Sequence, residues 1–96
     1  MQIPMTGRNI EITPAIRSYA EKKLQRISSL ADKMTHIHLT FHTEKVEQIA
    51  EANLSLPGLQ IHAKASSGDI YESIDKLVDK ITSQLNKHKG KLAGHG

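Results

Sequence analysis

The chain of 96 residues is long enough for one domain, and 13 Lys and Arg against 10 Asp and Glu give it a mildly basic net charge of +3. A domain of this size buries about two-thirds of the surface of its unfolded chain, enough for one modest core. The sequence has no cysteine, which excludes disulfides, zinc–thiolate sites and thiol catalysis and suits a reducing compartment. Since no signal-peptide pattern opens the chain and no apolar run approaches the roughly 18 residues of a membrane span, we expect a cytoplasmic protein without membrane contact.

The first two predicted elements are a short strand and a helix. The stretch "QIPMT" (2–6) predicts a strand that Gly7 ends, and Pro4, which has no N–H to donate, indicates an edge strand. The helix begins after Thr13, a good N-cap, with Pro14 in its first helical position. Its apolar face recurs at spacings of three and four through Ile16, Ala20, Leu24, Ile27 and Ala31, widened by Leu30.

Three strands of alternating polar and apolar residues come next. The stretches "THIHLTFHT" (35–43), "QIAEANLSL" (48–56) and "LQIHAKA" (59–65) each place every second residue on one apolar face. Pro57 and Gly58 suit the central positions of a type II turn between the last two strands. We expect an antiparallel meander whose inward residues are Ile37, Leu39, Phe41, Ala50, Ala52, Leu54, Leu56, Leu59, Ile61, Ala63 and Ala65.

A long amphipathic helix closes the predicted fold. Asp69 can cap its start, and Glu72 three residues later completes a pair similar to a capping box. Gly90 weakens the far end, so we set the domain at residues 1–92 and expect a flexible tail over 93–96. The apolar stripe consists of Ile70, Ile74, Leu77, Val78, Ile81 and Leu85.

The predicted order of elements is β-α-β-β-β-α, an α+β fold. Each strand of the meander and each helix has one apolar face, so two layers with both helices on one face of a four-stranded sheet bury all of them. The other face of the sheet is then open to water. Four histidines are expected on that open face: His36, His38, His42 and His62.

The sequence carries no pattern typical of an enzyme. It has no nucleophile elbow, no P-loop and no dinucleotide-binding glycine motif, and its carboxylates are spread over helix surfaces. We therefore expect no catalytic residues and no cofactor. The histidines leave three interpretations open: a zinc or nickel site, polar side chains on a wet sheet, or a partner-docking face. Metal is the weaker of these, because no carboxylate or cysteine in the pattern completes a usual ligand set.

Basic residues gather along one side of each predicted helix. Asp75 and Asp79 fall on the opposite flank of the last helix, so its charges segregate. In the first helix Lys22 and Arg26 share a flank and Lys23 borders the core face, and the two basic flanks can merge if the helices lie side by side. Lysines near a helix C-terminus also favour the helix dipole, which explains one or two of them but not a stripe. The stripe on the last helix lies within about 60° on a helical wheel and consists of Lys76, Lys80, Lys87 and Lys91.

The expected ligand of these cations is a polyanion. The chain has only three aromatic residues, and Phe41 is predicted inward, so the sheet is not a base-stacking platform for single strands. No helix-turn-helix or basic zipper is present. A rigid helix pair that contacts phosphates suits structured RNA that is recognised by its shape.

Several stretches resemble one protein family. "DIYESIDKLVDKITSQLNKHKGK" is similar to the second helix of bacterial ribosome hibernation factors, the ribosome-associated inhibitor and sigma-54 modulation protein family. "TGRNIEITPAIRSYAEKKLQRI" resembles the first strand and helix of that family, and "EANLSLPGLQIHAKASSGDIY" its central hairpin. Ile70 stands where Met is common in the family. The length resembles that of the short hibernation promoting factors, which have no second, dimerising domain.

The resemblance implies a fold of the double-stranded-RNA-binding-domain type and a place in the small ribosomal subunit. There the protein would overlap the messenger and transfer RNA sites of the decoding region, inhibit translation by occupancy and promote inactive ribosome dimers together with a ribosome modulation factor. Off the ribosome we expect a monomer. The alternatives are a general double-stranded RNA binder and a metal- or partner-binding module on the histidine face. The ribosomal-RNA contacts carried over from the family are Lys22, Lys23, Arg26, Lys76, Lys80, Lys87, His88, Lys89 and Lys91.

Overall fold

The structure, a computed structural model, describes residues 3–30, 34 and 36–94, and the side chains of residues 3–27, 34 and 36–87. Six elements follow one another in the predicted β-α-β-β-β-α order. They are β1 (Met5–Arg8), α1 (Pro14–Leu30), β2 (His36–Glu44), β3 (Glu47–Leu56), β4 (Leu59–Ser67) and α2 (Ile70–Gly94).

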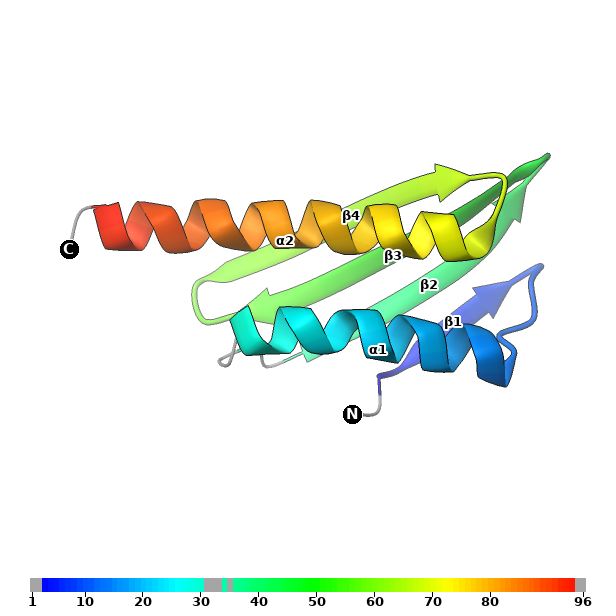
Figure 1. Cartoon of the computed structure of the whole chain (residues 1–96), viewed down its shortest axis with the longest axis horizontal. Coiled ribbons are helices and arrows are strands. Elements are labelled where there is room, and N and C mark those ends of the chain that lie inside the picture. Colours follow the sequence, from blue (N-terminus) through cyan, green and yellow to red (C-terminus); the bar gives the residue numbers. More distant parts are fainter. Residues whose placement is uncertain (1–2, 31–33, 35, 95–96) are drawn as a thin grey trace.

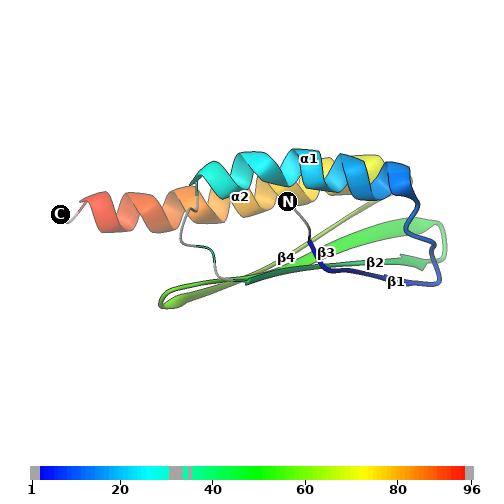
Figure 2. The ribbon, with the colours of Figure 1, turned by 90° about the horizontal axis from the view of Figure 1, so that it is seen from below.

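The four strands form one sheet in the order β1-β2-β3-β4. β1 is parallel to β2, and the other two pairings are antiparallel, which confirms the predicted meander. Both helices lie on the same face of the sheet, and the opposite face is uncovered (Figures 1 and 2). The α+β class and the two layers are therefore confirmed.

The core lies between the helices and the sheet. Phe41, Ala50 and Ala52 are fully buried from the sheet side, and Ile27 and Ile81 from the helix side. The core cluster follows the alternation predicted for the strands and the stripes predicted for the helices, because a period of two or of 3.6 residues places them on one face. Ile49 is also buried, but on the opposite face of the sheet. Ala31 and Thr35, which were assigned to a predicted helix and strand, lie outside the described residues.

Gly7 does not end the first strand as predicted. It lies inside β1, opposite Phe41, and the strand begins at Met5 rather than at residue 2. A Cβ at this position would come within 2.4 Å of the carbonyl oxygen of Ile10, so the glycine permits the chain to fold back tightly after the strand. Pro4 lies just before β1, and its carbonyl oxygen accepts the Leu39 N–H at 3.0 Å, in line with the predicted edge position.

The start of α2 is fixed to the sheet through Ser73. This side chain is fully buried, and its hydroxyl donates to the carbonyl oxygen of Gln48 on β3 at 2.6 Å. Asp69 caps the helix as predicted, since its Oδ1 accepts the Tyr71 N–H at 3.2 Å. α2 continues to Gly94, two residues beyond the domain boundary drawn at residue 92. The flexible tail over 93–96 stays a prediction.

Candidate RNA-binding surface

The two helices lie side by side and run in the same direction (Figure 1). Tyr19 of α1 reaches across the seam between them and donates its hydroxyl hydrogen to Asp75 Oδ1 of α2 at 2.8 Å. The Tyr19 and Tyr71 rings meet edge to face with centroids 5.1 Å apart. Lys23 lies 5.4 Å from the Tyr19 ring centroid, and its Nζ is 3.4 Å from Asp75 Oδ1. These four side chains, which we call the seam cluster, hold the helices at a fixed spacing.

The seam cluster changes the acidity of its tyrosine. The hydrogen bond to Asp75 raises the pKa of Tyr19 above its ordinary value, and desolvation and the negative charge of Asp75 act in the same direction. Lys23 opposes the shift because an ammonium favours the phenolate. The neutral tyrosine is therefore the form that joins the two helices.

Lys80, a member of the lysine stripe of α2, lies on the flank that points away from α1. Lys80 Nζ donates to the carbonyl oxygen of Lys64 on β4 at 2.6 Å, and β4 is the edge strand on the far side of the sheet from β1. The helices lie side by side, but Lys80 is turned to β4, so it does not join the basic flank of α1 as the sequence suggested it could. Core packing rotates α2 so that Asp75, and not a lysine, faces Lys23 of α1.

On α1 the three predicted contact residues are brought together. Lys22, Lys23 and Arg26 line one hollow on the helix layer with Tyr19 and Gln25. Lys22 and Arg26 are exposed, whereas Lys23 is held by the seam cluster. A phosphate entering this hollow would meet cations on a rigid helix.

On α2 the predicted contact residues differ in the partners that they have within the protein. Lys76 Nζ lies 3.4 Å from Glu72 Oε1 one turn earlier, and an exposed ion pair of this kind contributes little to stability. Lys80 is bound to the backbone of β4. Lys87 is exposed, on the last part of α2 for which side chains are described. The helix continues beyond the end of α1, as Figure 2 shows. His88, Lys89 and Lys91 belong to these last turns, and their side chains lie outside the described residues.

The histidines occupy the uncovered face of the sheet. His38 Nε2 lies 2.8 Å from Thr6 Oγ1 of β1. Glu51 stands between two other rings, with Oε2 3.2 Å from His62 Nε2 and Oε1 3.6 Å from His42 Nδ1. The sequence interpretation missed this carboxylate because Glu51 is on a different strand from His42. Among the described residues, no group of three or more His, Asp and Glu side chains is arranged to hold a metal ion.

None of the described helices is both long and apolar enough to cross a membrane.

Comparison with known proteins places this geometry in a family. The family model described as Sigma 54 modulation protein / S30EA ribosomal protein matches residues 3–93. The ribosome hibernation promoting factor of Klebsiella oxytoca is 44% identical over 95 residues, covering 99% of this chain and 100% of the relative. That of Escherichia coli (strain K12) is 39% identical over 95 residues with the same coverage.

Solved structures of similar proteins have the same fold. A ribosomal subunit interface protein from Coxiella burnetii superposes with a TM-score of 0.88 at 44% identity, over 94% of this chain and 99% of that one. The N-terminal domain of Thermus thermophilus Protein Y gives a TM-score of 0.82 at 33% identity, over 92% and 99% of the two chains. The chain belongs to the Sigma 54 modulation protein / S30EA ribosomal protein family, which confirms the resemblance found in the sequence.

Proposed function

We propose that this family member is a ribosome hibernation factor that binds the small subunit through its helix layer and silences translation by occupancy. It acts in the cytoplasm as a monomer off the ribosome, overlaps the messenger and transfer RNA sites of the decoding region, and promotes inactive ribosome dimers together with a ribosome modulation factor. It catalyses no reaction, so its dissociation restores the ribosome.

The observation that carries this proposal is the placement of exposed cations on a rigid helix pair. Lys22 and Arg26 line the hollow on α1, and Lys87 extends the charge along α2. The seam cluster fixes the two helices relative to each other, so the cations keep a constant spacing. Such a surface suits phosphates in structured RNA, where affinity comes from the backbone and selectivity from shape.

The names of the relatives supply the biological setting. Two of them are called ribosome hibernation promoting factor and another a ribosomal subunit interface protein, and the similarity extends over nearly the whole chain. The remaining contact residues assigned by resemblance, His88, Lys89 and Lys91 among them, are part of the same proposal. Lys23, Lys76 and Lys80 contribute through donors that their partners within the protein leave available.

The proposal is tested by replacing two exposed lysines of the helix layer, one on each helix. Lys22→Gln with Lys87→Gln should weaken co-sedimentation with purified small subunits and lower the slope of log K against log salt by about 1–2, since each lost phosphate contact removes about 0.7–0.9. Arg8→Gln with Lys45→Gln is the matched control, because it removes the same charge from the sheet layer. Inhibition of cell-free translation should fall for the first pair and persist for the second.

Two results would contradict the proposal. If both pairs behaved like the parent at every salt concentration, the helix layer would not be the binding surface. If the parent bound an equal mass of duplex RNA as tightly as small subunits, the general double-stranded RNA binder would be the better description.

A further inference from the structure

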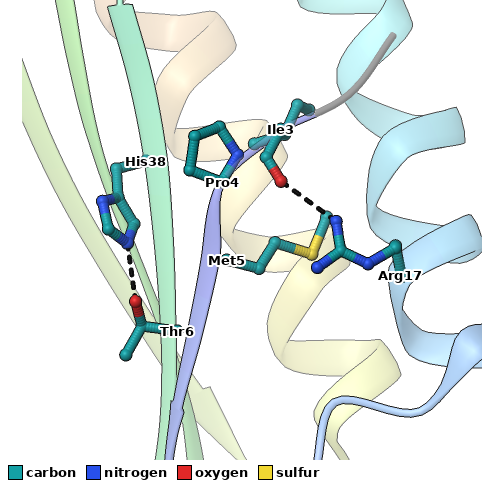
Figure 3. A pocket seen from close by; sticks show the side chains of 6 residues that line it. All are labelled: Ile3, Pro4, Met5, Thr6, Arg17 and His38. Carbon is teal, nitrogen blue, oxygen red and sulfur yellow. Dashed lines mark hydrogen bonds between the residues drawn. The ribbon is translucent and has the colours of Figure 1, made fainter.

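At each edge of the sheet, one cationic side chain from a helix donates a hydrogen bond to a backbone carbonyl oxygen. Just before β1, the carbonyl oxygen of Ile3 accepts a hydrogen bond from the guanidinium of Arg17 of α1 at 3.1 Å, as Figure 3 shows. On β4, the ammonium of Lys80 from α2 donates to the carbonyl oxygen of Lys64 at 2.6 Å. In each case a long cationic side chain leaves its helix and occupies a backbone acceptor at the edge of the sheet or just before it. We call Arg17 and Lys80 the edge cations.

A free edge of this kind is a template for another strand. In an antiparallel pair, alternate residues exchange both backbone hydrogen bonds with the partner strand, and the residues between them direct their N–H and C=O groups away from it. The Lys64 carbonyl accepts from Lys80, so Lys64 is turned outward, and by alternation so are His62 and Ser66. Unpaired groups in such a row can bind the edge of a second molecule unless something covers them.

The two edges differ in how much protection they have. β1 is only four residues long, and Pro4 just before it has no N–H to offer a second strand. β4 is nine residues long and contains no proline, and Lys64 is its one charged residue. β4 is therefore the edge on which a single covering side chain has the larger effect.

We propose that Lys80 keeps the protein from associating with itself by covering the β4 edge, and that the partner held off is the β4 edge of a second copy. Two copies related by a two-fold axis would pair β4 with β4 antiparallel, which continues the sheet across both molecules. Lys80 hinders this in two ways. Its ammonium occupies the Lys64 carbonyl that the second strand needs, and in a symmetric pair the two Lys80 charges would approach each other. The inference does not depend on RNA binding.

The test replaces the donor while keeping the length of the side chain. Lys80→Met should self-associate reversibly in analytical ultracentrifugation, with an association constant raised on the order of tenfold by the loss of one competing hydrogen bond. Lys76→Met is the matched control: it removes the same single charge from the same flank of α2 and should stay as monomeric as the parent. Lys80→Arg keeps a cationic donor and should also behave like the parent.

Amide hydrogen exchange identifies the surface that pairs. In concentrated Lys80→Met, the outward N–H groups of His62, Lys64 and Ser66 should gain protection, while those of β1 should not. Lys80→Gln, which also lacks the ammonium, provides a second variant if the first fails to fold. A folded Lys80 variant that stays monomeric into the millimolar range overturns the inference. So does equal association of the Lys76 control, or protection that appears away from β4.

Discussion

The anchoring of α2 through Ser73 gives a sharp prediction, because Ser73 is a fully buried polar residue on the face of the helix that packs on the sheet. Its hydroxyl oxygen is 2.6 Å from the carbonyl oxygen of Gln48 and 3.2 Å from the hydroxyl oxygen of Ser67. A hydroxyl has one hydrogen, and the shorter contact marks Gln48 as its acceptor. Ser73→Ala removes that donor without changing the shape of the core.

The expected cost follows from these contacts. Losing one buried hydrogen bond costs about 0.5–1.5 kcal/mol, and more where the acceptor is left partly unsatisfied, so we expect about 1–2 kcal/mol. Alanine is a better helix former than serine, which offsets up to about 0.5 kcal/mol of this loss. Ser83→Ala on the exposed side of the same helix carries the propensity gain alone and is the matched control.

Urea unfolding followed by circular dichroism measures the difference. With a denaturant slope of about 1 kcal/mol/M for a chain of this size, Ser73→Ala should unfold at a urea concentration about 1–2 M lower than Ser83→Ala. Equal midpoints for the two variants would refute the reasoning, because the Ser73 hydroxyl would then contribute nothing to the position of α2.

Two further predictions concern the seam cluster and the core. In a spectrophotometric titration Tyr19 should ionise above its ordinary pKa of about 10, and Asp75→Asn should bring that pKa down; an unchanged value in the variant would remove Asp75 as the cause. Because the folded-state pKa is the raised one, the stabilisation should be complete below about pH 10 and lost as the pH rises through the folded-state pKa. Leu77→Ala should cost about 2–5 kcal/mol in urea unfolding, since Leu77 is buried at the centre of the apolar stripe, and a change under about 0.5 kcal/mol would mean that the core face is misassigned.

The sequence was sufficient to predict features that depend on the periodic spacing of apolar residues within one helix or strand. Alternation along β2, β3 and β4 predicted which residues face the helices, and the spacing from Ile70 to Leu85 predicted the buried stripe of α2. These patterns are readable because each residue's face follows from its neighbours on the same element. The order of elements then left two layers as the simplest way to bury every apolar face.

The sequence was insufficient where the answer depends on how elements are rotated against each other. A helical wheel separates Lys76 and Lys80 from Asp75, but it does not say which flank faces α1. The burial of the whole core decides that rotation, and it turns Asp75 to the seam and Lys80 to β4. Gly7 was misjudged for a similar reason, because the need for a glycine comes from Ile10, which returns against the strand.

The extension of α2 past the rest of the molecule separates two tasks within one helix. Its first half carries Ser73, Leu77 and Ile81, which fasten it to the sheet, and Leu85 is the last buried residue described. The last turns of α2 extend beyond the end of α1 and the β3–β4 turn (Figures 1 and 2). Under the proposed function, substitutions in these turns are expected to change the attraction to RNA phosphates more than the stability of the fold. On that proposal, changes confined to the outer turns would alter affinity for the ribosome independently of thermal stability.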